Sequence, residues 1–138
     1  MSDWNTKLIE EFRTNDGKVS GQFEGAPLLL LNTIGAKSGQ PRTSPMMYLA
    51  DETDDQRVYV FASKAGMPTN PDWYHNLKAN PDVSVEVGGD TYDAVADEVT
   101  GDERDRLYAI QAERYPGFAE YEQKTDRTIP VVALVRKP

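Results

Sequence analysis

The sequence contains no cysteine and only one histidine, His75. The missing cysteine excludes disulfides, iron–sulfur clusters, thiolate zinc sites and a cysteine nucleophile, and it fits a reducing compartment. No serine or acidic pattern around His75 resembles a catalytic triad or a metal-binding helix. We therefore expect no metal site and interpret His75 as a surface or helix-packing residue.

Long hydrophobic runs are missing as well. The longest apolar stretch, Pro27 to Leu31, is far shorter than the about 20 residues of a membrane-spanning helix. The segment from Met1 to Trp4 lacks the pattern of a signal peptide. The 15 basic and 23 acidic residues give a net charge of -8, which disfavours binding to nucleic acid or to anionic membranes. We expect a cytoplasmic protein without a transmembrane segment.

Acidic residues are absent from two neighbouring segments of this acidic chain. Residues 25–50 and 56–71 contain no Asp or Glu, but they contain the basic residues Lys37, Arg42, Arg57 and Lys64. The acidic cluster between them is typical of a solvated hairpin tip. Such a tract indicates a site for an anion, and chance clustering is the alternative.

Hydrophobic periodicity predicts the secondary structure. Trp4, Leu8 and Phe12 recur every four residues and indicate a first helix capped by Ser2. Three more helices are expected, one from Asn70-Pro71 to Asn80 with Asn70 as its cap, one from Asp102 to Tyr115 whose charged start is a solvated face, and one around Phe118 and Tyr121. Six strands are expected at Leu28–Ile34, Arg42–Ala50, Arg57–Ser63, Val83–Val87, Thr91–Val99 and Ile129–Val135.

This order of elements favours one domain of 138 residues with a mainly β, α+β fold. Two hairpins and few helices do not alternate as a parallel sheet requires. We therefore predict an antiparallel six-stranded barrel or roll with peripheral helices.

Two loops carry groups that suit an anion. The segment from Gly35 to Arg42 joins two predicted strands, and its glycines allow amide hydrogens to converge while Lys37 and Ser38 add donors. The segment from Ala62 to Gly66 places a lysine at a strand end, just before a helix N-terminus. An ordinary glycine-rich hairpin with solvent-facing charges explains the first loop equally well.

Trp73 and Tyr74 in the short helix suit stacking on a planar ring, although such aromatic pairs more often belong to the core. The sequence has no thiol, no histidine cluster and no evident acid–base pair. An enzyme with these residues would depend on an organic cofactor, which the protein would bind and orient.

Three ordered motifs carry a resemblance to a known family: Leu30 to Arg42, Ala62-Ser63-Lys64, and Asn70 to Pro81. In this order they resemble the deazaflavin-dependent nitroreductase family, whose members bind coenzyme F420 in a split β-barrel. The similarity extends from about Leu28 to Pro130. It implies that residues 25–138 form a split-barrel cofactor-binding domain, to which residues 1–24 add an amphipathic helix and a loop.

The resemblance also implies a groove that holds the deazaflavin, with its phosphate and glutamyl tail at Lys37, Ser38 and Arg42. Reduced cofactor would pass a hydride to a small, electron-poor planar acceptor such as a quinone, a nitroaromatic or an enone, and a hydroxyl or water would supply the proton. The implied cofactor-binding residues are Ala36, Lys37, Ser38, Arg42, Thr43, Ser44, Pro45, Met46, Met47, Phe61, Ala62, Ser63, Lys64, Asp72, Trp73, Tyr74, His75 and Asn76.

On the substrate side, Ser63, Tyr115 and Tyr121 match the family's serine and tyrosines and are the implied catalytic residues. Met47 and Phe118 are the implied substrate-pocket residues, at positions where nitroimidazole-reducing relatives carry tyrosine. The loss of two hydroxyls makes quinones the preferred acceptor. Simple packing of the two tyrosines beside Pro116 is the alternative.

Three functions stay in competition on this basis: an F420-dependent reductase, a deazaflavin carrier without catalysis, and a related split barrel that binds FMN. The first helix either packs on the domain, closes over the substrate, or makes a weak contact with a membrane surface. The oligomeric state is left open.

Overall fold

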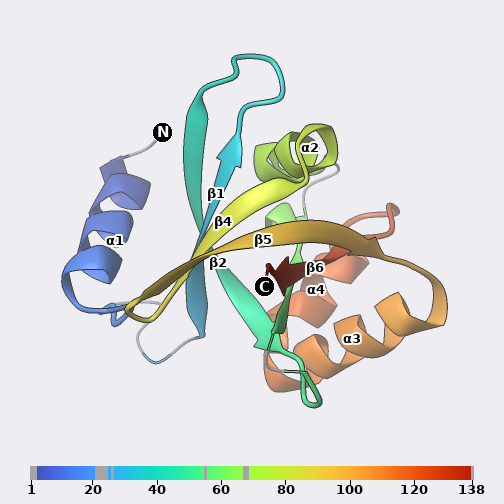
Figure 1. The fold of residues 1–138 in the computed structure, drawn as a ribbon. Helices are drawn as coiled ribbons and strands as arrows, with labels where there is room; N and C mark the ends of the chain where they lie inside the picture. The colour runs from blue at the N-terminus through green and yellow to red at the C-terminus, as the bar shows by residue number, and fades with distance from the viewer. Residues whose placement is uncertain (1–2, 21–24, 26, 55, 67–68, 138) are drawn as a thin grey trace.

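Figure 1 shows the computed structural model, which describes residues 3–20, 25, 27–54, 56–66 and 69–137. Six strands close into a barrel in the order β1-β2-β3-β6-β5-β4, and all the pairings are antiparallel. This confirms the predicted fold. The strands are β1 (Leu28–Ile34), β2 (Pro41–Ala50), β3 (Arg57–Phe61), β4 (Asp82–Val87), β5 (Asp90–Val99) and β6 (Val131–Arg136).

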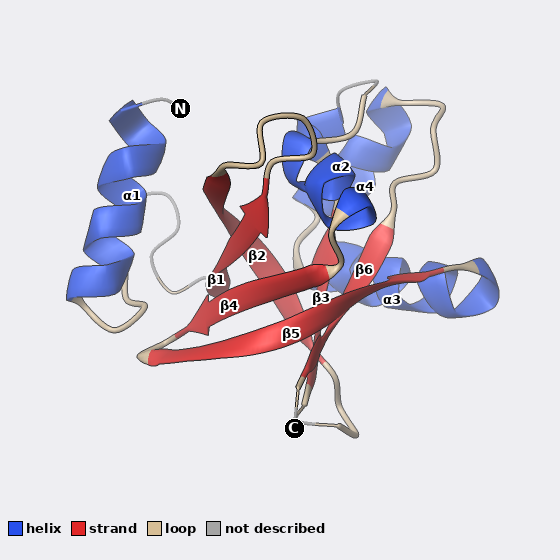
Figure 2. Cartoon of the chain, turned by 45° about the horizontal axis from the view of Figure 1, so that its top comes forward, coloured by secondary structure: helices blue, strands red, loops and turns tan. Residues whose placement is uncertain are grey.

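The helices lie in two groups around the barrel. Helix α1 is on one side of it, and helices α3 and α4 are on the other (Figure 2). No helix in the described part of the chain is both long and apolar enough to cross a membrane. The helical segments are α1 (Asp3–Thr14), the 3-10 turn η2 (Lys64–Gly66), α2 (Asp72–Ala79), α3 (Gly101–Arg114) and α4 (Gly117–Lys124).

Strand β1 is buried on both of its faces. Leu29 and Leu31 belong to the cluster inside the barrel, which also contains Leu77 of α2. Leu28 and Leu30 point the other way and pack against the apolar face of α1, formed by Leu8, Ile9 and Phe12. A strand that is covered on both faces needs an unbroken apolar run, which explains the four consecutive leucines. The side chain of Trp4, predicted to share the helix face, lies outside the described residues.

Helices α3 and α4 cover the opposite outer wall of the barrel. Phe61 at the end of β3 makes edge-on contacts with Tyr108 of α3 at 5.8 Å and with Phe118 of α4 at 5.7 Å between ring centroids. The Tyr108 hydroxyl donates to the Phe118 carbonyl at 2.7 Å. This aromatic cluster fixes both helices on strands β3 and β6.

Two predictions about single residues are wrong. Asn70 does not cap α2, because its side-chain oxygen accepts a hydrogen bond from Arg127 at 2.8 Å and the helix begins after Pro71 without a side-chain cap.

Arg104 does not belong to a solvated helix face. It is only 8% exposed, donates two hydrogen bonds to the Ile129 carbonyl and stacks on the Tyr108 ring. In both cases a partner distant in sequence overrides the local pattern. The predicted cap Ser2 lies outside the described residues.

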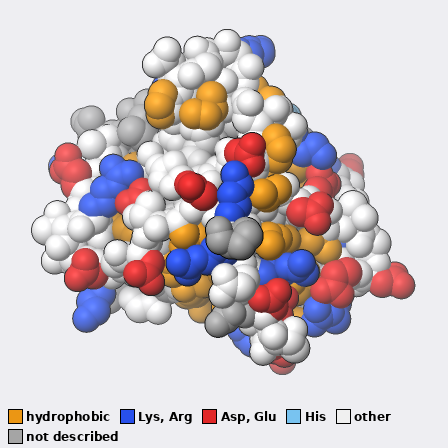
Figure 3. Space-filling model, viewed as in Figure 1, with side chains coloured by type: hydrophobic (Ala, Val, Ile, Leu, Met, Phe, Trp, Pro, Cys, Tyr) orange, Lys and Arg blue, Asp and Glu red, His pale blue; other side chains and the backbone are white. Residues whose placement is uncertain are grey.

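Acidic and basic side chains lie side by side over the face of the barrel seen in Figure 3. Ion pairs join several charged side chains of the described chain, such as Lys137 with Asp82 at 2.9 Å and Lys78 with Glu98 at 2.9 Å. The net charge of -8 is therefore not gathered into a single acidic patch on this face.

Gln111 on the buried face of α3 is the basis of a prediction about stability. It is fully buried, and neither of its amide atoms has a hydrogen-bond partner among the described residues. Since an unsatisfied buried amide is destabilising, Gln111→Met should raise the free energy of unfolding in urea by about 1–3 kcal/mol. Gln123→Met, at an exposed position of α4, is the matched control and should leave it nearly unchanged. A clear loss of stability in Gln111→Met would show that the buried amide of Gln111 is not destabilising.

Candidate functional site

A groove of about 1190 Å³ lies between α1, the connection from β1 to β2, and α2. Its volume exceeds the about 300–1,000 Å³ of ordinary small-molecule sites, which suits an elongated ligand. The groove is lined by Thr6, Ile9, Glu10, Arg13, Gly35, Ala36, Lys37, Ser38, Pro41, Arg42, Thr43, Ser44, Asp72, Trp73, His75 and Asn76.

The connection from β1 to β2 is built as a tight loop that presents donors. The Gly35 amide donates to the Gln40 carbonyl at 2.8 Å, and the Gly39 amide donates to the Gly35 carbonyl at 3.0 Å. A Cβ on Gly35 would lie 2.4 Å from the Ser38 hydroxyl oxygen, so a larger residue here would require the Ser38 side chain to rotate away. The amides of Lys37 and Ser38 have no partner among the described residues and are available to a ligand.

Lys37 and Arg42 add positive charge at this end of the groove. Both side chains are exposed, and neither forms an ion pair within the described part of the chain. Unlike the sequence tract, the assembled groove is not free of acids, because α1 contributes Glu10 and α2 contributes Asp72. The arrangement at Lys37 and Arg42, with free amides beside them, still suits a phosphate or a carboxylate.

Asn76 ties the loop to α2 and to the end of β1. Its side-chain oxygen accepts a hydrogen bond from the Ala36 amide at 2.9 Å, and its side-chain nitrogen donates to the Thr33 hydroxyl at 3.2 Å. Asn76 is 8% exposed and Thr33 is 2% exposed. One of these bonds is buried and the other is partly buried, and together they fix the loop on the rim of the barrel.

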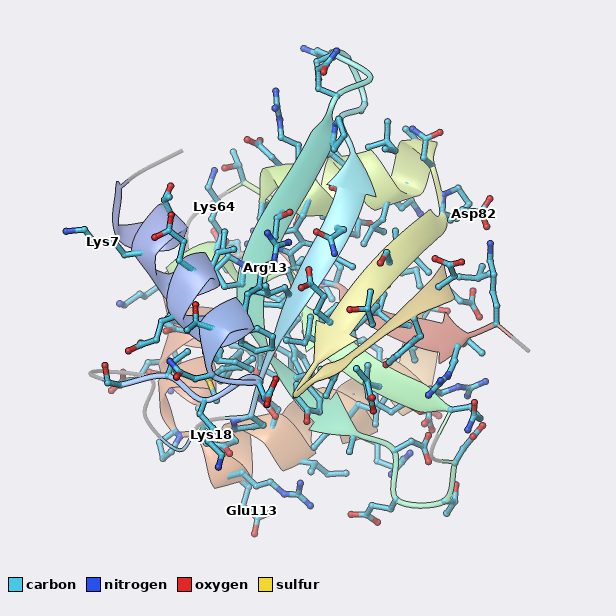
Figure 4. The ribbon with its side chains drawn as sticks, turned by 60° about the vertical axis from the view of Figure 1, so that its left-hand side comes forward. Lys7, Arg13, Lys18, Lys64, Asp82 and Glu113 are labelled. Atoms are coloured by element: carbon cyan, nitrogen blue, oxygen red, sulfur yellow. The ribbon has the colours of Figure 1, made fainter. Side chains whose placement is uncertain are left out.

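Helix α1 forms the opposite wall of the groove and is held there by an ion pair. Arg13 reaches from α1 toward the sheet (Figure 4) and binds both carboxylate oxygens of Glu86 on β4, at 3.0 and 2.8 Å. Hydrogen bonds from Arg13 hold the pKa of Glu86 below its usual value, and the same pairing raises the pKa of Arg13. The carboxylate of Glu86 therefore stays ionised at neutral pH.

The structure brings many of the sequence-predicted cofactor residues into this groove, but not all of them. Predicted residues on its wall are Ala36, Lys37, Ser38, Arg42, Thr43, Ser44, Asp72, Trp73, His75 and Asn76. Tyr74 points elsewhere, because its hydroxyl donates to Glu98 at 2.6 Å; burial and this bond raise its pKa to about 12. The other predicted cofactor residues outside the groove wall are Pro45, Met46, Met47, Phe61, Ala62, Ser63 and Lys64.

Four of the five residues predicted for the substrate side, all except Ser63, belong to one cluster away from the groove wall. Met47, Tyr115 and Tyr121 are partly buried and pack on the cluster that contains Phe61 and Phe118. The rings of Phe118 and Tyr121 lie 5.3 Å apart. Met47 is three residues beyond Ser44 on β2, which at the usual rise of a strand is roughly 10 Å from the groove's edge.

Ser63 and Lys64 leave β3 through a segment that is held from several sides. Arg127 donates to the Ala62 carbonyl at 3.1 Å and to the Ser63 carbonyl at 2.9 Å, besides its bond to Asn70. Burial lowers the pKa of Arg127, but arginine remains charged in proteins. Arg127 thus joins two stretches that sequence analysis assigned to the cofactor, the end of β3 and the entry to α2.

The sequence allowed the first helix to close over the substrate, but it did not indicate which of its residues line the groove, namely Thr6, Ile9, Glu10 and Arg13. It also did not indicate the supporting residues Asn32, Thr33, Glu86 and Arg127. Asn32 and Thr33 gave a usable signal, because they are polar residues at the end of an apolar strand. Arg13 and Glu86 gave none, since 73 residues separate them. No group of three or more histidine or acidic residues that would hold a metal occurs in the described ranges.

Comparison with known proteins extends over nearly the whole chain. Residues 4–136 match the model of a family described as F420H(2)-dependent quinone reductase. The chain is 41% identical over 130 residues to the F420H(2)-dependent quinone reductase Rv1261c of Mycobacterium tuberculosis, covering 91% of this chain and 85% of that protein.

Two solved structures agree with this match. One, solved as a domain-swapped dimer, has a TM-score of 0.71 and 42% identity, covering 94% of this chain and 92% of that chain. The other, the F420-H2 dependent reductase FDR-A, has a TM-score of 0.68 and 44% identity, covering 78% of this chain and 93% of that chain.

The tie formed by Asn76 leads to a prediction. Asn76→Ala removes one buried and one partly buried hydrogen bond and leaves the Thr33 hydroxyl and the Ala36 amide without them, so the free energy of unfolding should fall by about 2 kcal/mol. Amide hydrogen exchange at Ala36 should become faster, because its acceptor is gone. Asn80→Ala, at the exposed end of the same helix, should change neither quantity appreciably. Unchanged exchange at Ala36 in Asn76→Ala would mean that the loop is fixed by other contacts.

Proposed function

The chain belongs to the F420H(2)-dependent quinone reductase family, and we propose on this basis that it reduces quinones with reduced coenzyme F420 as hydride donor. Nitroaromatics and enones are acceptors of the same electron-poor, planar class. The observation that carries the proposal on the structural side is the groove with Lys37, Arg42 and the free amides of Lys37 and Ser38 on its wall.

The residues of the groove fit a deazaflavin with an anionic tail. Such a molecule is long, planar at one end and negatively charged at the other. The loop from Gly35 to Arg42 offers donors and positive charge, which suits the phosphate and glutamyl carboxylates. Half-buried Trp73 offers an apolar ring surface on the same wall. Strand β2 leads from there toward Met47 and the aromatic cluster, where the planar end and the acceptor would meet.

When bound, the reduced deazaflavin supplies the hydride, and the protein's residues bind, orient and protonate. Lys37 and Arg42 would hold the anionic tail and thereby orient the cofactor in the groove. Ser63 is 9% exposed, and its hydroxyl has no partner among the described residues, so it is available to a ligand. Arg127 holds the Ser63 carbonyl and so fixes the direction of this segment.

On the acceptor side, Tyr115 and Tyr121 are half-buried beside Phe118. Their phenol hydroxyls are suited to donate a hydrogen bond, and then a proton, to the oxygen of a reduced quinone. Met47 and Phe118 contribute apolar surface and no hydroxyl. A quinone ring, which needs donors only at its two oxygens, suits this surface better than a nitroimidazole that needs orienting hydroxyls along its length.

The function is tested by binding and by turnover. Purified protein is titrated with oxidised coenzyme F420 and, in parallel, with FMN, and fluorescence is followed. Oxidation of reduced F420 by menadione is then measured with and without protein. We expect binding of the deazaflavin in preference to FMN, and steady oxidation only when protein is present.

Each competing function gives a different result in these assays. Preferential binding of FMN would favour the flavin-binding alternative. Tight binding of F420 without turnover on any quinone, nitroaromatic or enone would favour a carrier. Binding of neither molecule would contradict the proposal altogether.

The positive charge of the groove leads to a further prediction. Lys37→Ala and Arg42→Ala should each weaken binding of F420 by about 1–3 kcal/mol, roughly 5- to 150-fold in Kd, because each removes a charge-assisted bond to an anionic oxygen. The loss should be larger for cofactor with a longer glutamyl tail.

Lys7→Ala is the matched control for these two variants. Lys7 is also exposed, but it points away from the sheet on the outer side of α1 (Figure 4). Lys7→Ala removes the same charge from the protein as the other two variants, so an effect of net charge on affinity would appear in all three. Unchanged affinity in both Lys37→Ala and Arg42→Ala would show that the anionic part of the cofactor lies elsewhere.

A further inference from the structure

A chain of hydrogen bonds crosses three strands on the barrel face that α1 covers. Glu86 on β4 accepts a hydrogen bond from the Asn32 side-chain nitrogen on β1 at 2.9 Å. The Asn32 side-chain oxygen accepts one from the Thr43 hydroxyl on β2 at 2.6 Å. Asn32 and Thr43 are directly opposite in the β1–β2 pairing, so the backbone register holds them together.

The direction of these hydrogen bonds is forced by chemistry. An ionised carboxylate can only accept, and the bidentate contact with Arg13 keeps Glu86 ionised. Asn32 must therefore turn its NH₂ group toward Glu86 and its oxygen toward Thr43. With an acceptor facing it, the Thr43 hydroxyl must donate its single proton to Asn32.

Thr43 also lines the groove. Since its proton is committed to Asn32, the lone pairs of its hydroxyl oxygen are what it can offer to a ligand. Ser38, in the loop with Lys37, differs from Thr43 in the direction of its hydrogen bond. Its hydroxyl oxygen accepts a bond from the Gln40 amide at 3.2 Å, which leaves its proton free to donate.

We propose that the Thr43 hydroxyl oxygen accepts a hydrogen bond from a donor group of the deazaflavin ring or its polyol chain, and that Glu86 and Asn32 are positioning residues that fix Thr43 as an acceptor. The inference rests on the proposed cofactor and deepens it. The groove then has two chemically distinct ends, with donors for anionic oxygens at Lys37, Ser38 and Arg42 and an acceptor for a hydroxyl or imide N–H at Thr43.

The experiment measures the Kd of oxidised F420 by fluorescence titration for four variants that circular dichroism shows to be folded. Thr43→Val keeps the shape but removes the acceptor, and binding should weaken about tenfold. Thr43→Ser retains the hydroxyl and should restore most of the affinity. Glu86→Gln replaces an obligate acceptor by an amide that can face either way, so binding should weaken several-fold. Thr91→Val, on β5 opposite Glu86 and outside the groove, is the control for the same substitution in this sheet.

The double variant Glu86→Gln/Thr43→Val distinguishes an effect of Glu86 through the hydrogen-bond chain to Thr43 from an effect through a loosening of α1. If Glu86 acts through Thr43, adding Glu86→Gln to Thr43→Val should cause no further loss of affinity. If it acts by releasing Arg13 and α1, the two losses should multiply, which would overturn the assignment of Glu86 as a positioning residue.

A second ligand locates the donor. The deazaflavin–polyol fragment, without phosphate and glutamyl tail, should lose the same factor in Thr43→Val as the intact cofactor does. A loss seen only with the intact cofactor would move the contact to the tail and overturn the proposal. If wild-type protein and Thr43→Val bind F420 equally well, the role of Thr43 as an acceptor is overturned and the proposed function is not. Wild-type protein that does not bind F420 would overturn the proposed function as well.

Discussion

The register between β1 and β2 is the constraint on which the candidate site depends. Pairing of Ile34 with Pro41 places the loop of residues 35–40 on the rim of the barrel, and pairing of Asn32 with Thr43 brings their side chains together. The same register directs Thr43, Pro45 and Met47 to the outer face of β2, while Met46 packs against the barrel interior. A slip of one residue would turn each of these side chains to the other face of β2 and would separate Thr43 from Asn32.

Much of this framework could be predicted from sequence because it depends on local patterns. Each strand has its own apolar run or alternation, and the loop after β1 has the glycines that a tight turn needs.

What could not be predicted depends on partners far along the chain. Asn70 has the residue type of a helix cap, but Arg127 occupies its oxygen. Arg104 lies in a charged stretch, but the Ile129 carbonyl and the Tyr108 ring give it a place in the interior. Helix α1 carries an apolar face that predicts packing, yet nothing in that face predicts that its polar side forms a groove wall.

The local charge at the groove depends on which charged side chains have a partner, more than on the net charge of the protein. Several acidic side chains of the sheet have a basic or hydroxyl partner, as Glu86 has Arg13 and Glu98 has Tyr74 and Lys78. Lys37 and Arg42 are left without such a partner among the described residues, at the place where the loop amides are also free. An acidic protein can therefore attract an anion at one point of its surface, because fields from paired charges cancel over a Debye length.

Met47 packs against two clusters at once, the one that holds α1 and the one that holds α3 and α4. A thioether side chain has three rotatable bonds and adapts its shape at little energetic expense. It therefore joins the packing of a helix that borders the groove to the packing of the aromatic cluster under α3 and α4. A change of rotamer at Met47 can adjust the contact with one cluster without displacing the other.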